Sequence, residues 1–483
     1  MEDPMKKYFS IVLVCLLVFL LGVAPISQSH QTAFAASTTK SFSSNYTLVN
    51  LGGDTAAVTA SYIAPNGAEW GNSIYKSFSI LPGANQIVRQ YYDTGLTPGR
   101  GSVVIASSQP LGAMVQERVL SGVPSSGAYT GIASPSTTWY IPLLARHGSS
   151  ATGLANSQVI VQNVGTSAVN FSVAFYALGS SSPTYTKNFT NVAAGAAVLY
   201  DVEEETNLPN GFWGSAVVST GAGSLGVVTN LFFGADSLNA YNAFPQESID
   251  DTWYVPLLYV RLGNSLTTSL TIQNLSGTTI PIGDLSLLCT KNPSAPGAGT
   301  ISLSNHTALP INGSYVFNTL TDPARFPDAG WYGSCKISSN TNKGFVAYTH
   351  NRWIATSEQA ACEAVPGSMT STNVAVPLIA KRLANGFANS LYIQNISNEM
   401  ATVTLTYLPE GGGTPIVRSG ITIGPGESLR RNFRLSATEL PEITDGWVGS
   451  LTVTSNKPIA AYVENTTLFP NGDQFMAYLG FNY

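Results

Sequence analysis

The sequence has 483 residues, a tenth of them charged, and a formal net charge of −5. A charged fraction well below the usual quarter, with no basic cluster, excludes the kind of surface that nucleic-acid binding requires. Hydrophobic residues make up 44% of the chain, which excludes the composition of a disordered protein. We therefore expect an ordered protein with a weakly charged surface rich in hydroxyl groups.

The first 36 residues have the pattern of an export signal. Lys6 and Lys7 precede an apolar run over residues 11–23, and small residues suited to cleavage follow at 33–36. The pattern predicts a signal peptide over residues 1–36, a secreted or cell-surface protein, and no membrane span in the mature chain. An uncleaved signal anchor is the alternative.

A signature that recurs four times divides the rest of the chain into repeats. A strand-like stretch ends in Asn, and a Gly-Ser pair follows about fifty residues later. Successive copies are about 110–120 residues apart, the size of a whole domain rather than of a solenoid repeat. The signature residues are Asn50, Asn163, Asn274 and Asn395, with Ser102, Ser215, Ser334 and Ser450. The repeats predict four domains, over residues 37–136, 137–250, 251–371 and 372–483.

Within each copy, apolar residues alternate with a period of two. In the second copy, alternating stretches at 158–163, 169–176 and 216–218 are separated by turn residues. About seven short strands in some 110 residues are typical of an antiparallel β-sandwich. We therefore predict an all-β fold, with four tandem antiparallel immunoglobulin-like β-sandwiches after the signal peptide. Turn formation and packing explain the recurring Asn, Gly and Trp residues better than ligand binding does.

Three proline-containing segments lie at the joints between copies, around Pro142, Pro256 and Pro377. Proline cannot donate to a strand ladder, so each segment is an edge strand or a strand with a break in its pairing. The sequence leaves open whether each segment opens the following sandwich or closes the preceding one. The first mature copy has no such segment, so its sheet edge is a surface with which a strand of another chain could pair.

Residues 159–179 resemble the CARDB-like family of bacterial immunoglobulin-type sandwiches. The matching pattern is a strand ending in Asn163, a glycine-containing turn, and a second alternating strand that reaches Tyr176. The first and fourth copies share this pattern, whereas the third departs from it at Pro281 and Gly283. The resemblance implies adhesion, spacer or filament modules on an exported protein, and it brings no catalytic residues.

Three cysteines remain after the signal, Cys289, Cys335 and Cys362, and all lie in the third copy. Their spacing fits no compact zinc site. In the immunoglobulin-type topology that the resemblance implies, the three positions lie near one pole of the sandwich. We therefore expect one disulfide, Cys289–Cys335, with Cys362 as the alternative partner. The remaining thiol would be buried or would form a bridge to another chain.

Residues with catalytic or metal-binding potential form no recognisable motif. The mature chain has three histidines, and none lies in a nucleophile–base or metal-ligand arrangement. Asp201 with residues 203–205, and Asp250 with Asp251, could bind calcium, but a solvated loop is the simpler interpretation of each. We predict no catalytic residue and no cofactor, with calcium as the alternative.

The predicted function is that of a non-enzymatic exported protein, a surface, adhesive or extracellular structural component. Its partners would be other copies of itself, surface proteins or polysaccharide. Trp70 and Trp353 do not recur between copies, and they are the candidate ligand aromatics of an alternative, a carbohydrate- or matrix-binding protein. A second alternative is an extracellular hydrolase with a site between domains.

Overall fold

The computed structural model describes residues 10–16, 41–150, 153–234, 237–263, 266–297, 299–435, 440–468 and 472–483. Within these ranges the chain forms strands and three short 3₁₀ helices, η1 (Gln90–Tyr92), η2 (Gln246–Ser248) and η3 (Gly367–Met369). The described part contains no helix with the length and apolar character needed to cross a membrane. The prediction of an all-β, sandwich-type fold is confirmed.

Four modules of one plan follow each other along the chain. Module 1 contains β2 (Phe42–Asn50), β3 (Ala56–Ile63), β4 (Ser77–Ile80), β5 (Asn85–Val88), β6 (Gly101–Ser107), β7 (Leu111–Val119) and β8 (Ser125–Thr130). Module 2 contains β9 (Thr138–Arg146), β10 (Gly148–Ser150), β11 (Gly153–Asn163), β12 (Val169–Ala177), β13 (Tyr185–Val192), β14 (Ala197–Asp201), β15 (Phe212–Ser219), β16 (Leu225–Phe233), β17 (Leu238–Asn242) and β18 (Phe244–Pro245).

Modules 3 and 4 repeat the plan. Module 3 contains β19 (Thr252–Val260), β20 (Leu266–Asn274), β21 (Leu285–Lys291), β22 (Thr300–Ser304), β23 (Ser314–Asn318), β24 (Trp331–Ser339), β25 (Phe345–Trp353), β26 (Glu358–Glu363) and β27 (Val365–Pro366). Module 4 contains β28 (Ser371–Lys381), β29 (Phe387–Asn395), β30 (Ala401–Pro409), β31 (Ile416–Ile423), β32 (Ser428–Asn432), β33 (Trp447–Thr467), β34 (Met476–Leu479) and β35 (Phe481–Asn482).

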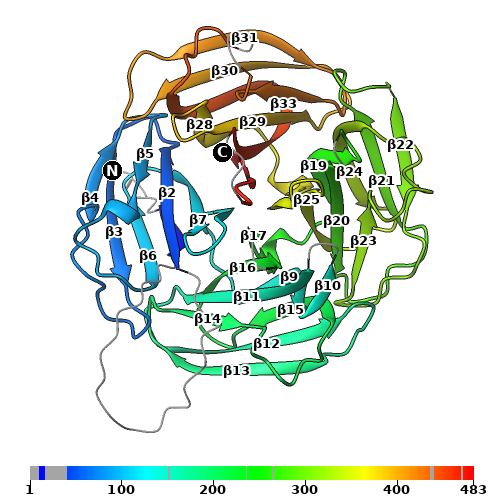
Figure 1. Ribbon diagram of the computed structural model, residues 1–483, viewed down its shortest axis with the longest axis horizontal. Helices are drawn as coiled ribbons and strands as arrows, with labels where there is room; N and C mark the ends of the chain where they lie inside the picture. Colours follow the sequence, from blue (N-terminus) through cyan, green and yellow to red (C-terminus); the bar gives the residue numbers. More distant parts are fainter. Residues whose placement is uncertain are drawn as a thin grey trace, which may run out of the picture.

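Each module pairs an inner with an outer antiparallel sheet. The inner sheet of module 1 has the order β5-β2-β7-β8, and that of module 3 has the corresponding order β23-β20-β25-β26. The outer strands β3, β12, β21 and β30 lie toward the rim of the molecule (Figure 1). Alternation in the sequence sets the two faces, because Val169, Phe171, Val173 and Phe175 of β12 are buried whereas Asn170 is exposed. In module 4 the long strand β33 takes part in both sheets.

The proline-containing joint segments form the strands β9, β19 and β28, and each opens the following module. They pair with β15, β24 and β33 respectively in the outer sheet. The pairing register shifts next to the proline in all three, as between Val255 and Leu258 around Pro256. A bulge at this point explains why proline is accepted within a paired strand.

In module 1 the corresponding edge of β6 is paired with β1 (Ser10–Leu16). The register runs from Ser10 opposite Ser107 to Leu16 opposite Gly101. This strand lies within the segment predicted to be a signal peptide, and the rest of that segment lies outside the described residues. In the unprocessed chain, β1 therefore occupies the place that a joint strand occupies in the other modules.

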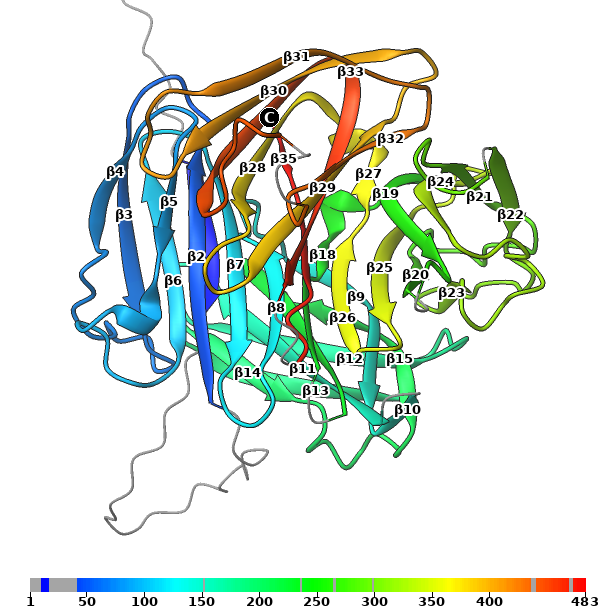
Figure 2. The same ribbon diagram turned by 45° about the horizontal axis from the view of Figure 1, so that its top comes forward.

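The four modules close into a ring (Figure 1). The last strands of the inner sheets, β8, β17, β26 and β34, each contact the next, and β34 contacts β8. The first and last modules lie side by side, because β28 contacts β2 and β7 (Figure 2). We refer to the four contacts as the 1–2, 2–3, 3–4 and 4–1 interfaces.

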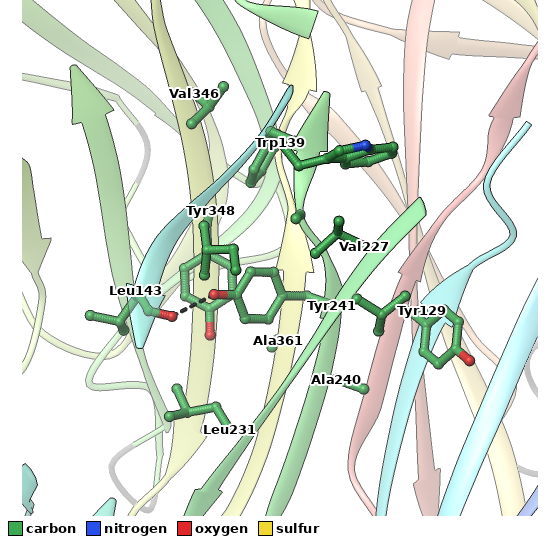
Figure 3. Close-up of a cluster of buried hydrophobic side chains, with 14 of the residues drawn as sticks. Tyr129, Trp139, Leu143, Val227, Leu231, Ala240, Tyr241, Val346, Tyr348 and Ala361 are labelled. Atoms are coloured by element: carbon green, nitrogen blue, oxygen red, sulfur yellow. Dashed lines mark hydrogen bonds between the residues drawn. The ribbon is translucent and has the colours of Figure 1, made fainter. Parts of the chain in front are cut away.

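Buried aromatic side chains continue from module to module around the centre. The rings of Tyr241 in module 2 and Tyr348 in module 3 lie 4.3 Å apart between centroids, and the Tyr241 hydroxyl donates to the carbonyl oxygen of Leu143 (Figure 3). Tyr129 of module 1 lies in the same cluster. Since this apolar cluster crosses module boundaries, the modules stabilise each other through burial.

Candidate functional site

The signature serines form a hydrogen bond across each interface of the ring. In every module the serine hydroxyl donates to a backbone carbonyl oxygen of a turn in the next module. The pairs are Ser102 with Gly195, Ser215 with Asn312, Ser334 with Gly426, and Ser450 with Gly83. The bond from Ser450 returns to module 1, so the same contact closes the ring.

Each accepting turn is held by the signature asparagine of its own module. In module 4 the backbone N–H of Gly426 donates to the carbonyl oxygen of Asn395, and the Asn395 side chain donates to the carbonyl oxygen of Gly424, both at 3.1 Å. The accepting residue has a left-handed φ of +70° at Gly426 and +60° at Asn312, a conformation that favours Gly or Asn. The signature therefore builds an interface, and its two halves act in neighbouring modules.

The glycine before each signature serine is required by a close approach of two strands. A Cβ atom on Gly333 would lie 2.1 Å from the carbonyl oxygen of Thr290 in β21. On Gly449 it would lie 2.1 Å from the carbonyl oxygen of Leu408 in β30. The glycine thus allows the signature strand to pair closely with its outer-sheet neighbour, in agreement with the interpretation from the sequence.

One buried carboxyl group links module 4 to the other three modules. The Asp473 side chain accepts hydrogen bonds from the Ser237 hydroxyl of module 2 at 2.7 Å and from the Gln359 backbone N–H of module 3 at 3.0 Å. Its backbone carbonyl oxygen accepts from the N–H of Ser126 in module 1 at 2.7 Å. Burial raises the pKa of Asp473 well above its ordinary value. We refer to this residue as the ring hub.

A cavity of about 340 Å³ lies at the 3–4 interface, and we call it the 3–4 cavity. Its volume falls at the lower end of the range for small-molecule sites, roughly 300–1,000 Å³. Both modules contribute to its wall, which combines aromatic rings with a few polar groups. The aromatic residues are Tyr259, Tyr332, Trp353, Tyr392 and Phe475, and the polar residues include Ser390, Arg430, Asn432, Arg434, Glu464 and Thr466.

A hydrogen-bonded network connects the two modules beneath the cavity. The Tyr259 hydroxyl donates to Oε2 of Glu464 at 2.7 Å and lies 3.1 Å from the Tyr392 hydroxyl. On the far side, the Tyr462 hydroxyl lies 3.5 Å from Oε1 of Glu464 and accepts a bond from Nδ2 of Asn351 at 2.8 Å. Networks of this kind fix side-chain positions, so the cavity has a preformed polar floor.

Glu464 is the carboxyl group of this floor, and it titrates near neutrality. Burial raises its pKa to about 7, although the hydrogen bond from Tyr259 and the positive charges of Arg430 and Arg434 favour the ionised form. Near pH 7 the carboxyl group is therefore ionised in only part of the molecules. The charge of the cavity consequently becomes more positive as the pH falls through this value.

Arg430 and Arg434 supply the positive charge. The Arg430 guanidinium lies 5.6 Å from the centroid of the Tyr332 ring, within cation–π range. Its Nε atom is buried and has no hydrogen-bond partner in the described part of the chain. Neither arginine takes part in an ion pair with a carboxylate among the described residues. Both guanidinium groups therefore line the cavity without a direct ion pair among the described residues, although Arg430 also bonds to the Tyr332 side chain and both charges act on Glu464.

Of the two tryptophans proposed from the sequence, only Trp353 lies in the cavity wall. Its indole Nε1 atom is buried and makes no hydrogen bond within the described ranges. Trp70 instead lies in the core of module 1, with 6% of its surface exposed, and its Nε1 donates to the carbonyl oxygen of Thr97 at 3.1 Å. A buried and satisfied indole offers no face to a ligand, so Trp70 has a packing role.

The cysteines of module 3 lie on two different sheets. Cys289 of β21 and Cys335 of β24 face each other across the outer sheet and are joined by a disulfide. Cys362 lies in β26 as a buried free thiol. Its place opposite Thr349 corresponds to the places of Tyr129 and Tyr241 in modules 1 and 2.

The acidic residues that could have bound calcium are engaged in local hydrogen bonds. Glu205 accepts from the hydroxyl of Tyr200 at 2.8 Å, and Asp201 accepts from Gln158 at 3.1 Å. Asp250 accepts from the backbone N–H groups of Thr252 and Ser368, Asp251 accepts from the Thr252 hydroxyl, and Glu203 lies 3.5 Å from His147. Over the residues that the structure describes, no three His, Cys, Asp or Glu side chains are grouped as metal ligands would be.

The sequence interpretation missed Tyr259, Tyr392, Arg430 and Glu464. A usable signal was present, because Tyr392 lies three residues before its signature asparagine, where the other copies have Thr47, Ile160 and Thr271. Arg430 pairs with Tyr392 in the inner sheet, and the corresponding partners are Ile87, Leu199 and Val316. A position that is aliphatic in three copies and charged in the fourth indicates a specialised site.

Comparison with known proteins assigns no family. No protein-family model matches the chain, and no curated protein is similar to it. Among solved structures, the chain is similar to the crystal structure of Thermotoga maritima 1070, with 21% sequence identity and a TM-score of 0.20. The match covers 23% of this chain and 95% of that chain. A likeness of this strength carries no functional conclusion.

Proposed function

We propose that this protein is an exported, non-enzymatic binding protein that takes a saccharide in the 3–4 cavity. The observation that carries the proposal is the composition of the cavity wall, five aromatic side chains together with two arginines, a glutamate and small polar groups. Aromatic faces suit the apolar faces of a sugar ring, and convergent polar groups suit its hydroxyls. The closed ring of modules serves as the rigid scaffold.

The chemistry of the wall supports binding rather than hydrolysis. Glycoside hydrolysis in most enzymes needs two carboxyl groups on either side of one bond. Glu464 is the single acidic residue among the described residues of the wall, and its Oε2 atom is already bonded to Tyr259. The same groups suit recognition, since tyrosine, arginine and asparagine side chains donate to sugar oxygens.

Export is part of the proposal and rests on two features. The N-terminal residues have the pattern of a signal peptide. The Cys289–Cys335 disulfide of module 3 fits an oxidising compartment. The broader hypothesis of a surface, adhesive or structural component stays a prediction. The cavity favours the carbohydrate-binding alternative, because it gives that alternative a defined site.

The test is a glycan array followed by titration calorimetry on the full chain. We expect Trp353→Ala and Tyr392→Ala to weaken saccharide binding at least about tenfold, which corresponds to about 1.4 kcal/mol. Tyr91→Ala is the matched control, because Tyr91 is an aromatic residue of module 1 with 64% exposure and lies outside the cavity. Unchanged binding in both cavity variants, or the absence of any bound glycan, would contradict the proposal.

A further inference from the structure

The 3–4 cavity carries more positive charge than recognition of a neutral sugar needs. Arg430 of β32 and Arg434, two residues after the strand, line it, and the acidic residue in the described wall is Glu464. Glu464 titrates near pH 7, so it neutralises the arginines only in part. An excess of cationic groups in a partly buried cavity favours an anionic ligand.

Arg430 is held in a geometry that suits a carboxylate. Its guanidinium lies over the Tyr332 ring, and its buried Nε atom has no partner among the described residues. A planar guanidinium presents a fork of donors that matches the two oxygens of a carboxylate. The contact with Tyr332 holds the guanidinium in place before the ligand arrives, which reduces the entropy lost on binding.

The position that Arg430 occupies in module 4 does not require an arginine. At the same place the other three modules carry Ile87, Leu199 and Val316, and these modules make the same interface contact through their signature serines. Arg430 is half-buried, and a charge that is partly removed from water is stabilised by a partner of opposite charge. Arg430 is not needed by the interface, makes no direct ion pair among the described residues and lines a cavity, so it points to an anionic ligand as a further partner.

We propose that Arg430 and Arg434 bind the carboxylate of an acidic saccharide, a sugar ring of the uronic-acid type. This inference rests on the proposed function. The sugar ring lies against the aromatic wall, and the carboxylate lies at the arginines. A ligand with a sugar ring and a carboxylate explains why one cavity combines aromatic residues of both modules with the two arginines.

The pH dependence of binding follows from the groups that surround Glu464. The positive charges near it are Arg430 and Arg434, and the hydroxyl groups near it are those of Tyr259, Tyr392 and Tyr462. When Glu464 is protonated, its charge no longer opposes the ligand carboxylate. Binding of the acidic saccharide is therefore tighter below pH 7 than above it, and Glu464→Gln removes most of this difference.

The experiment is calorimetry on the full chain with a galacturonate disaccharide and with its neutral galactose counterpart. Wild-type protein is expected to bind the acidic sugar at least about tenfold more tightly, a difference of about 1.4 kcal/mol. Arg430→Gln should remove the preference for the acidic sugar, so that the two sugars bind with equal affinity, whereas Arg430→Lys should restore part of the preference. Arg118→Gln is the control, since Arg118 is an exposed arginine on β7 of module 1.

The outcomes separate the two proposals. Equal binding of both sugars by wild-type protein, with loss of both in Trp353→Ala, overturns the acidic preference and leaves saccharide binding intact. An acidic preference that Arg430→Gln leaves unchanged overturns the role of Arg430. No binding of either sugar, nor of any glycan on the array, overturns both proposals. Thermal melts of each variant identify any loss of folding.

Discussion

The 1–2 and 3–4 interfaces share a backbone arrangement and differ in the side chains that fill it. Ser102 bonds to Gly195 at one interface, and Ser334 bonds to Gly426 at the other. At the 1–2 interface the gap beside this contact is lined by Pro65, Arg100, Gly101, Ile160, Ala197 and Leu199, and it has a volume of about 10 Å³. At the 3–4 interface, the 3–4 cavity has a volume of about 340 Å³.

The two interfaces differ at two corresponding positions that line these spaces. Ile160 and its strand neighbour Leu199 stand where module 4 has Tyr392 and Arg430. The aliphatic pair lines the small 1–2 gap, whereas the longer polar pair lines the 3–4 cavity. The hydrogen bond from the signature serine to a backbone carbonyl oxygen is therefore common to the interfaces. The side chains beside this bond differ from one interface to the next. A ring of similar modules can thus hold one binding site.

The largest expected effect tests a property that three of the four interfaces share, a buried carboxyl group. Glu117 accepts from Asn230 at the 1–2 interface, Glu363 accepts from the N–H of Asn242 at the 2–3 interface, and Glu464 bonds to Tyr259 at the 3–4 interface. Burial raises the pKa of all three from 4.5 to about 7.

Because these pKa values are higher in the folded than in the unfolded chain, the stability that the neutral groups contribute is complete below about pH 4.5 and is lost as the pH rises through about 7. The loss is about 3 kcal/mol for each group. Thermal melts should therefore show a lower melting temperature at pH 8.5 than at pH 5. Glu117→Gln should reduce this difference. A melting temperature that rises between the two pH values would contradict the assignment.

The next largest effect tests whether the interfaces depend on one another. Asp473→Ala at the ring hub leaves the Ser237 hydroxyl and the Gln359 N–H without their acceptor, at a cost of about 2–4 kcal/mol in the free energy of unfolding. Asp473→Asn keeps the shape and one acceptor oxygen, so it should cost less. Denaturant titration measures both variants. Equal stability of Asp473→Ala and wild-type protein would show that the hub bonds are dispensable.

The smallest effect sharpens the comparison of the two interfaces directly. Ser102→Ala and Ser334→Ala each remove one signature hydrogen bond, and each should lower the free energy of unfolding by about 1 kcal/mol. Only Ser334→Ala should also weaken saccharide binding, since its bond holds the turn next to Ser428 and β32 at the 3–4 interface. Calorimetry on both variants checks this. An equal loss of binding in the two variants would argue against a site confined to the 3–4 interface.

Local pattern in the sequence was sufficient to predict the strands and the all-β fold. The alternation in β12 and the spacing of the signature asparagines depend on neighbouring residues and on length, which a sequence displays directly. The interface role of the signature serine was not predictable, because Ser450 and Gly83 are 367 residues apart and meet only when the ring closes. Folding across such distances leaves no local pattern.

The aromatic candidates show the same limit for the site. Trp70 and Trp353 were equivalent as residues that occur once, yet the exposure of each depends on its surroundings. Trp70 packs against the signature Gly101, much as Trp447 packs against Gly449, so it takes in module 1 the place that Trp447 has in module 4. Trp353 lies at the end of β25, where the facing module leaves space. Burial of a single aromatic residue is thus decided by the tertiary structure.

The 4–1 interface differs from the others in its covalent connection. The chain connects the modules directly at the other three interfaces, whereas noncovalent contacts hold the 4–1 interface. They include hydrogen bonds from Ser450 to the carbonyl oxygen of Gly83 and from Asn85 to that of Pro377, and the ion pair between Arg89 and Glu410. Under a pulling force applied to modules 1 and 4, the contacts of the 4–1 interface bear the load first and share it between them. When these contacts break, the ring opens into a linear chain of four modules. The force that the ring withstands is therefore set by the 4–1 interface.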